Sequence, residues 1–372
     1  MAGPLESLKV VEFAGLGPAP LAGQLLADLG AQVTVIDRAS GTAQPWDVNR
    51  RGKRSVALNL KSPDGRAVAH AVIAQSDILI EGFRPGVMER LGLGPDMCPD
   101  SLIYGRMTGW GQSGPLARVA GHDITYLATS GVLGLLGSAQ APPKPPLNLV
   151  ADYGGGAMFL LYGVLAAIIS RGVTGKGQVV DAAMIDGVPA MMGLIHTLMA
   201  QGIWHNQPGT NWLDGGAPFY RCYRCADGRD VAVGALEPQF YALLLAGLGL
   251  SDADLPDQND RDGWPTLAAC FADAFARAPR DHWSRVFDGS DACVAAVLSM
   301  DEAAHHPHLQ PRAVYTDVNG VRQAAPAPRF SATPAGPVQA PTAPGAQTDQ
   351  VLADLGYAPE AIRALRDGGA LT

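Results

Sequence analysis

The stretch Leu8–Asp37, LKVVEFAGLGPAPLAGQLLADLGAQVTVID, decides the fold. Its apolar run Leu8–Phe13 predicts a buried strand, Gly15–Pro20 a tight turn, and the helical spacing of Leu21–Leu29 a helix. A second apolar run, Ala31–Asp37, predicts another strand. A strand, a helix and a strand in this order form a unit whose two strands run parallel.

The same alternation continues to about residue 107. Ser55–Leu60, Asp77–Glu81 and Leu102–Met107 are further short apolar runs, and Pro63–Gln75 has helical spacing. Repeated crossovers predict an α/β fold with a Rossmann-like parallel sheet covered on both faces. Ligands of such sheets bind at the carboxyl ends of the strands. We therefore expect the site just after some of five residues: Phe13, Asp37, Leu60, Glu81 and Met107.

The rest of the chain predicts a second, smaller domain. Helical spacing marks Ala157–Ser170 and Val180–Ala200, which close a large domain of residues 1–200 that the segment 316–372 completes. Residues 201–218 form a linker, and 219–315 form a small α+β domain. This small domain contains a hairpin over Phe219–Leu236, turning at residues 226–229, and helices over Gln239–Gly247 and Leu267–Ala278. Within the C-terminal segment, the Pro-rich stretch Ser331–Ala346 predicts an extended strap, and Thr348–Leu355 a short helix.

Composition excludes several classes of protein. Of 372 residues, 47% are apolar and 17% charged, which excludes intrinsic disorder. The formal net charge of −8 argues against a nucleic acid or an anionic membrane as partner. The apolar run Ala157–Ile169 is shorter than the roughly 18 to 20 residues that span a bilayer, and residues 1–6 do not resemble a signal peptide. We therefore expect a cytoplasmic protein, in which the five cysteines are reduced.

Three motifs are similar to cofactor or metal sites but are better explained as ordinary structural features of the chain. Gly15–Pro20 with Asp37 is similar to a dinucleotide fingerprint, but Pro20 replaces the third glycine and Pro18 removes an amide donor, which favours a tight turn near a ligand. Cys222 and Cys225 lack a second ligand pair, and the His305–His308 run lacks other ligands, so we expect no metal.

Two further motifs point to chemistry. The basic run Asn49–Arg54 is either a solvated loop or a site for a polyanion such as a phosphate-bearing thioester carrier. His122 and Asp152 each lie in a glycine-flanked segment, and Asp152 precedes a helical run. Asp152 can cap that helix, or it can act beside an anion that the helix N-terminus stabilises.

Long segments of the chain resemble the family III CoA-transferases, and within that group the enzymes that epimerise 2-methylacyl-CoA thioesters. The resemblance runs in family order from residue 5 to about 250 and continues more loosely in the tail. The matching segments are LKVVEFAGLGPAP, NRRGKRSVALNLK, DILIEGFRPGVMERLG, YGRMTGWGQSGP, AGHDITY, PPLNLVADYGGGAMFLLYGVLAA, GKGQVVDAAMIDG, NWLDGGAPFYRCYRCADG, VAVGALEPQFY and, in the tail, APGAQTDQVLADLG.

The resemblance implies an interlocked homodimer that needs no cofactor and moves the α-proton of its acyl-CoA substrate. His122 and Asp152 would flank the α-carbon as the acid/base pair, with the enolate stabilised by amides of residues 152–156. Glu237 would pair with the histidine, from the partner subunit's small domain. Asn148 would orient the Asp152 loop, with Gly154 and Gly155 as supporting residues. The CoA contacts implied by the resemblance are Arg38, Leu58, Asn59, Leu60, Lys61, Gly82, Phe83, Arg84, Arg90, Gly121, Asp123, Ile124, Thr125 and Tyr126.

Two alternatives remain open. In the transferases of the group, the aspartate that matches Asp152 is a nucleophile, which forms an acyl anhydride and passes CoA to another acid. That chemistry does not need a histidine at position 122, so His122 and Glu237 favour epimerisation. A CoA-binding protein without activity is the third possibility, and it leaves His122, Asp152 and Glu237 unexplained.

Overall fold

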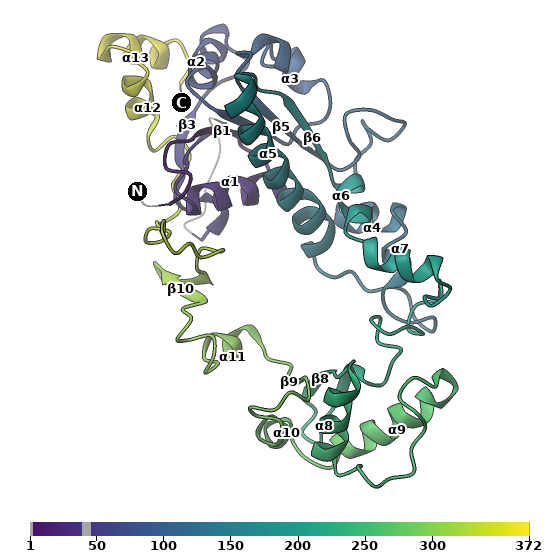
Figure 1. Cartoon of the computed structure of the whole chain (residues 1–372). Coiled ribbons are helices and arrows are strands. Elements are labelled where there is room, and N and C mark those ends of the chain that lie inside the picture. Colours follow the sequence, from purple (N-terminus) through teal and green to yellow (C-terminus); the bar gives the residue numbers. More distant parts are fainter. Residues whose placement is uncertain (1–2, 39–45, 372) are drawn as a thin grey trace. The chain divides into compact units, whose positions relative to one another are not determined.

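The computed structural model describes residues 3–38 and 46–371, and these form two units (Figure 1). The larger unit comprises Met1–Ser130, Pro146–Met191 and Gln310–Thr372, and the smaller unit comprises Gly131–Pro145 and Met192–Leu309. The sequence predicted boundaries near residues 200 and 316 instead.

A six-stranded sheet is the centre of the larger unit. Its order is β3-β2-β1-β4-β5-β6, and every neighbouring pair is parallel. This is the order of a doubly wound Rossmann-like sheet, so the predicted α/β fold is confirmed. The strands are β1 (Lys9–Phe13), β2 (Gln32–Asp37), β3 (Arg54–Ala57), β4 (Ile78–Glu81), β5 (Ile103–Thr108) and β6 (Val179–Ala183).

The edge strand β6 was missed by the sequence analysis. Residues Val179–Ala183 pair in parallel with Tyr104–Thr108, where we expected the start of a helix. The chain then forms two short helices, α6 (Met184–Ala190) and α7 (Gly193–Ala200). Two consecutive β-branched residues suit a strand better than a helix, and only the neighbouring strand β5 reveals that role.

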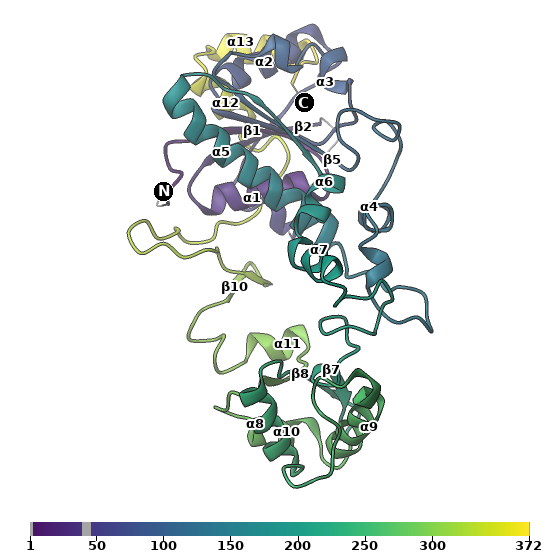
Figure 2. The ribbon, with the colours of Figure 1, turned by 45° about the vertical axis from the view of Figure 1, so that its right-hand side comes forward.

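Helices cover both faces of the sheet (Figures 1 and 2). One face carries α1 (Pro18–Asp28) and α5 (Met158–Thr174). The other carries α2 (Pro63–Ala74), α3 (Val87–Arg90), α12 (Thr348–Asp354) and α13 (Pro359–Asp367). On this second face Phe13 and Leu79 belong to one buried core with Ile73 and Leu352. The predicted C-terminal helix is therefore confirmed as α12, whereas α13 was not predicted.

The helical run Leu149–Thr174 is longer than its sequence pattern predicted. It has 26 residues, a mean hydropathy of 1.7 in its most apolar window, and a third of that window is buried. By length and composition alone it is the one helix among the described residues that is able to cross a membrane. Core helices of soluble proteins meet the same criterion, so the run by itself is a weak indication.

The cations of the basic run Arg50–Arg54 have a structural role within the larger unit, and its interpretation as a polyanion site stays a prediction. Each of its four cations pairs with a carboxylate of the same unit, and two of these pairs are almost fully buried. The N–O distances are 2.6 Å for Arg50–Asp37, Arg51–Asp28 and Lys53–Glu12, and 2.7 Å for Arg54–Asp354. The pairing of Asp37 also removes it as a ribose-binding acid.

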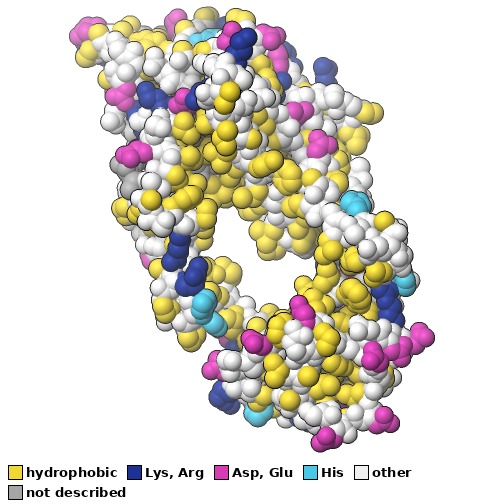
Figure 3. All heavy atoms as spheres, in the orientation of Figure 1, with side chains coloured by type: hydrophobic (Ala, Val, Ile, Leu, Met, Phe, Trp, Pro, Cys, Tyr) yellow, Lys and Arg dark blue, Asp and Glu magenta, His cyan; other side chains and the backbone are white. Residues whose placement is uncertain are grey.

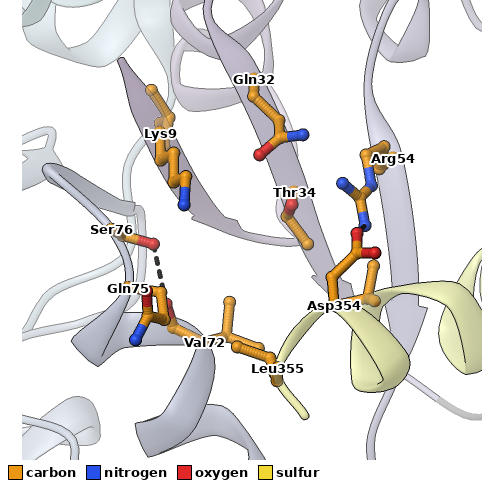
Figure 4. A pocket seen from close by; sticks show the side chains of 11 residues that line it. Lys9, Gln32, Thr34, Arg54, Val72, Gln75, Ser76, Asp354 and Leu355 are labelled. Carbon is orange, nitrogen blue, oxygen red and sulfur yellow. Dashed lines mark hydrogen bonds and ion pairs between the residues drawn. The ribbon is translucent and has the colours of Figure 1, made fainter. Parts of the chain in front are cut away.

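The C-terminal strap lies along β3 of its own chain. Ser55 accepts a hydrogen bond from the Gln347 amide at 3.1 Å, and the Thr342 hydroxyl donates to the Lys53 carbonyl at 2.7 Å. Arg54 of β3 reaches Asp354 at the end of α12, beside a small cavity of about 70 Å³ at the amino edge of the sheet (Figure 4). The strap thus covers a sheet edge that would otherwise be open to pairing.

The smaller unit is α+β. Its sheet has the antiparallel order β7-β8-β9, and the hairpin β7–β8 with its turn at 226–229 confirms the prediction. An aromatic core that includes Tyr223, Phe271 and Phe275 lies between sheet and helices. Its strands are β7 (Tyr220–Arg224), β8 (Asp230–Gly234) and β9 (Val294–Ala296), and its α-helices are α7, α8 (Pro238–Leu248), α9 (Trp264–Phe275), α10 (Arg280–Val286) and α11 (Met300–Ala304). A separate hairpin, β10 (Tyr315–Val318) and β11 (Val321–Ala324), belongs to the larger unit.

Candidate active site

A cavity of about 480 Å³ opens at the carboxyl ends of three central strands. Leu16–Ala19 follow β1, Gly82–Pro85 follow β4, and Met107–Trp110 end and follow β5; all of them line the cavity. The sheet order reverses between β1 and β4, which is where ligands of doubly wound sheets bind. The cavity thus lies after Phe13, Glu81 and Met107, three of the five predicted positions, whereas the residues after Asp37 and Leu60 do not line it.

His122 and Asp152 line the same cavity although they lie far apart in sequence. His122 directly precedes α4 (Asp123–Thr129). Its backbone is held by Thr125, whose hydroxyl accepts from the His122 amide at 2.9 Å and donates to the His122 carbonyl at 2.7 Å. The imidazole therefore projects from a fixed backbone into open space, since the residue is exposed.

Asp152 lies inside a π-helical segment, η4 (Leu149–Ala157), rather than before a helix as the sequence predicted. The segment continues directly into α5, and π-helical turns occur often at functional sites. It packs closely on α6, because a Cβ at Gly155 would lie 2.8 Å from the Val188 amide nitrogen. Gly155 thus permits this close helix packing.

The environment of Asp152 raises the pKa of its carboxyl group. Partial burial is the main cause, and the negative charge of Asp123 adds to it. The side-chain amide of Asn148, 3.4 Å from Oδ2, and the charge of His122 oppose the increase. A carboxyl group with a raised pKa holds a proton more readily near neutral pH, which suits a general acid as well as a base.

The side chain of Asp123 points into the protein, and its contact with CoA stays a prediction. Its side chain is buried, and its Oδ2 accepts hydrogen bonds from the amides of Ala151 and Asp152, both at 2.8 Å. The Asp152 amide, which we expected to stabilise an enolate, is therefore already engaged. The later amides of the π-helical segment donate within the helix.

Tyr126 forms one buried wall of the cavity. Its ring meets Trp110 edge to face, with centroids 4.8 Å apart, and it packs against the backbone of Gly109 and Gly121. Burial and the nearby charge of Asp152 raise the pKa of the Tyr126 phenol. The two glycines are required here, because a Cβ at either position would overlap the ring.

A carboxylate holds the loop that follows β4. The Glu81 carboxylate accepts a hydrogen bond from the Phe83 amide at 2.7 Å and another from the Arg106 guanidinium at 3.1 Å. Burial nevertheless raises the pKa of Glu81, which these hydrogen bonds oppose. Gly82, Phe83 and Arg84, three of the residues expected to contact CoA, are thereby placed in the cavity wall.

The other residues expected at the site do not line this cavity. Leu58 is a core residue, and Asn59 donates to the Gly369 carbonyl at 3.1 Å, so this turn holds the C-terminus. Glu237 directly precedes α8 as its N-cap residue in the smaller unit, and its pairing with His122 stays a prediction. The CoA roles of these residues also stay predictions: Arg38, Leu58, Asn59, Leu60, Lys61, Arg90, Ile124 and Thr125.

Several residues of the cavity were not singled out beforehand. Trp110 and Gly109 lie just past the end of β5, and Met184 begins α6 directly after β6. The rule of strand ends would have found Gly109 and Trp110. That rule does not indicate Met184, because the sequence pattern predicts a helix where the structure has β6.

No cluster of three or more metal-ligating side chains occurs among residues 3–38 and 46–371. The five cysteines are free thiols. Cys222 is exposed and Cys225 buried, so the two do not share a face.

Comparisons with known proteins agree with this geometry. The profile of CoA-transferase family III matches residues 5–349. The chain is 46% identical to alpha-methylacyl-CoA racemase of Mus musculus and 44% identical to that of Homo sapiens, in each case over 96% of this chain and 95% of the relative. Its fold is similar to that of a CAIB/BAIF family protein from Brucella suis, with a TM-score of 0.81 at 23% identity over 95% of this chain and all of the other.

Proposed function

The chain belongs to CoA-transferase family III, and we propose that it is an alpha-methylacyl-CoA racemase, an isomerase that inverts C2 of 2-methylacyl-CoA thioesters. The observation that carries the proposal is the pair His122 and Asp152, which line one cavity at the switch point of the sheet. Similarity to the two mammalian racemases along nearly the whole chain supports the same function.

The two residues act as a two-base pair. One removes the α-proton from one face of C2, and the other returns a proton to the opposite face of the resulting enolate. An imidazole titrates near neutral pH, and the raised pKa of Asp152 brings its carboxyl group closer to the same range. The pair therefore needs no cofactor to move the proton in either direction.

The enolate charge needs a favourable environment as it forms. The first turn of α1 has no side-chain cap, and Pro18 and Ala19 of this turn line the cavity. The positive end of the helix dipole favours an anion there. Gly17 lies close to Asp152, because a Cβ at Gly17 would be 3.6 Å from its Oδ2. The dipole of α1 and the Ala19 amide would therefore contribute to stabilising the enolate, whereas Pro18 and Pro20 have no N–H to donate.

CoA binds along the strand ends, with Arg84 the cation that the cavity wall itself supplies. An arginine fork suits the phosphates of the carrier. We infer that the enzyme acts as a homodimer in which Glu237 of one subunit completes the site of the other. An exposed apolar stripe on α5, formed by Met158, Tyr162, Ile169 and Val173, is a surface for such contact (Figure 3). A cytoplasmic location is consistent with this function.

The test is incubation of one epimer of a 2-methylacyl-CoA with the protein in deuterated water. We expect deuterium at C2 together with epimerisation, measured by mass spectrometry and chiral chromatography. A family III transferase would instead pass CoA from Asp152 to an added carboxylic acid. Transfer without exchange at C2 would overturn the proposal.

Substitutions of His122 and Asp152 test the roles proposed for these two residues. His122→Ala and Asp152→Asn should each lower exchange by about 100- to 10,000-fold, since each removes one acid/base group. Binding of CoA itself should stay within a few-fold. The matched controls are His308→Ala, an exposed histidine of the smaller unit, and Asp77→Asn, a carboxylate beside the amino end of the sheet. Full exchange by His122→Ala would contradict the two-base assignment.

A further inference from the structure

Asp123 connects the two segments that carry the proposed acid/base pair. It follows His122 directly in the chain, as the first residue of α4. Its carboxylate is 7% exposed, and one oxygen, Oδ2, accepts the amides of Ala151 and Asp152, each at 2.8 Å. One side chain therefore joins the start of α4 to the π-helical segment almost 30 residues further along.

We propose that Asp123 is a positioning residue, which sets the separation and the orientation of His122 and Asp152 on either side of the substrate carbon. The inference rests on the proposed function of the cavity. A two-base transfer needs both groups in line with a single carbon, and a displacement of about 1 Å in such a site costs roughly a hundredfold in rate. Asp123 is attached to one group through the chain and to the other through two hydrogen bonds.

The first amides of the π-helical segment explain why the residue at position 123 is acidic. A helix leaves its first amides without partners inside the helix, and the Asp123 carboxylate accepts two of them, those of Ala151 and Asp152. Its second oxygen, Oδ1, is buried and accepts no hydrogen bond from the described protein atoms. A serine or threonine would satisfy the same amides without burying a charge, so an aspartate at this position indicates a role for the charge.

That charge acts on Asp152. The titratable groups that interact with the Asp152 carboxyl are His122, Asp123 and Tyr126. Asp123 raises the pKa of Asp152 and His122 lowers it, while partial burial is the main cause of its increase. Asp123 therefore tunes the proton affinity of Asp152 as well as its place.

The experiment compares Asp123→Asn and Asp123→Ala with wild type and with Asp77→Asn. Asp77 also accepts a backbone amide, that of Lys9 at 2.9 Å, but at the amino edge of the sheet. The measurements are kcat and KM for C2 deuterium exchange with both epimers over a range of pH, binding of free CoA, and thermal melting.

Asp123→Ala should lower kcat by about a hundredfold with little change in KM or in CoA binding. Asp123→Asn keeps an acceptor oxygen and should recover part of kcat. Because it removes a negative charge near Asp152, the limb of the pH profile assigned to Asp152 should move to lower pH with both epimers. Asp77→Asn should leave the profile unchanged.

An Asp123→Asn enzyme that melts like wild type, with unchanged kcat and pH profile, would overturn the inference. So would a loss confined to KM, which would make Asp123 a CoA contact. If Asp123→Ala does not fold, the decision rests on Asp123→Asn alone. Absence of exchange in the wild-type protein would instead overturn the proposed function, so the two failures are distinguishable.

Discussion

Replacing Gly109 by alanine tests whether the backbone at the end of β5 shapes the active-site wall. A Cβ built at Gly109 lies 2.1 Å from Cζ of Tyr126 and 2.3 Å from its hydroxyl oxygen. The backbone of Gly109 does not have a positive φ, so alanine is compatible with its conformation. The substitution therefore places one methyl group against the ring of Tyr126 and changes nothing else.

The structure sets the size of the effect. An ordinary contact begins at 3.4 Å, so the ring must move by about 1.3 Å. Gly121 on the other side and Trp110 at its edge leave little room for that shift. Overpacking of this kind costs about 1–3 kcal/mol, equivalent to a Tm lower by roughly 3–8 °C. Because Tyr126 belongs to α4, which begins directly after His122, we expect kcat to fall by about tenfold to a hundredfold.

The assay combines thermal melting with C2 deuterium exchange. Gly172→Ala is the matched control, because Gly172 lies in α5 with nothing within 4 Å of its Cβ position. It should gain up to about 1 kcal/mol of stability through helix propensity and keep its activity. In a double-mutant cycle, Tyr126→Leu should relieve most of the destabilisation caused by Gly109→Ala. Wild-type melting and kcat in Gly109→Ala would refute the reasoning.

Three further predictions concern the rest of the chain. Lys53→Met leaves Glu12 buried without its partner and should cost about 3–5 kcal/mol in urea unfolding at pH 7. Burial already raises the pKa of Glu12, so the loss should shrink towards pH 4 as the carboxyl is protonated in both states; a pH-independent loss would contradict this. Ile169→Glu on the exposed stripe of α5 should weaken dimers in light scattering, and an unchanged dimer would exclude that face. Burial raises the pKa of Cys98 to about 11, so at pH 8 it should react with a thiol reagent far more slowly than exposed Cys222; equal rates would refute this.

Much of the fold follows from local sequence. Five of the six central strands were predicted because each is a short apolar run that ends at a turn signal, such as Ala31–Asp37. Their alternation with helices requires crossovers and hence a parallel sheet. The rule of strand ends then placed the cavity after Phe13, Glu81 and Met107.

Contacts between segments distant in sequence explain the strand and the ion pairs that the sequence did not predict. Val179–Ala183 became a strand through β5, which outweighed the helical spacing of the segment that it begins. The cations of Arg50–Arg54 met carboxylates from four different segments. No periodicity in a single segment contains that information.

The sequence by itself determined the class of sheet through local hydrophobic patterns, and with long motif matches it predicted the edge at which a site lies and the pair His122 and Asp152. Only the tertiary structure decided that the ends of β1, β4 and β5 form the cavity while β2 and β3 do not. It also decided that Asp123 faces the Asp152 segment. The physical reason is that burial and hydrogen bonding depend on segments far apart in sequence. The Asp123 carboxylate, for example, accepts hydrogen bonds from amides almost 30 residues further along the chain.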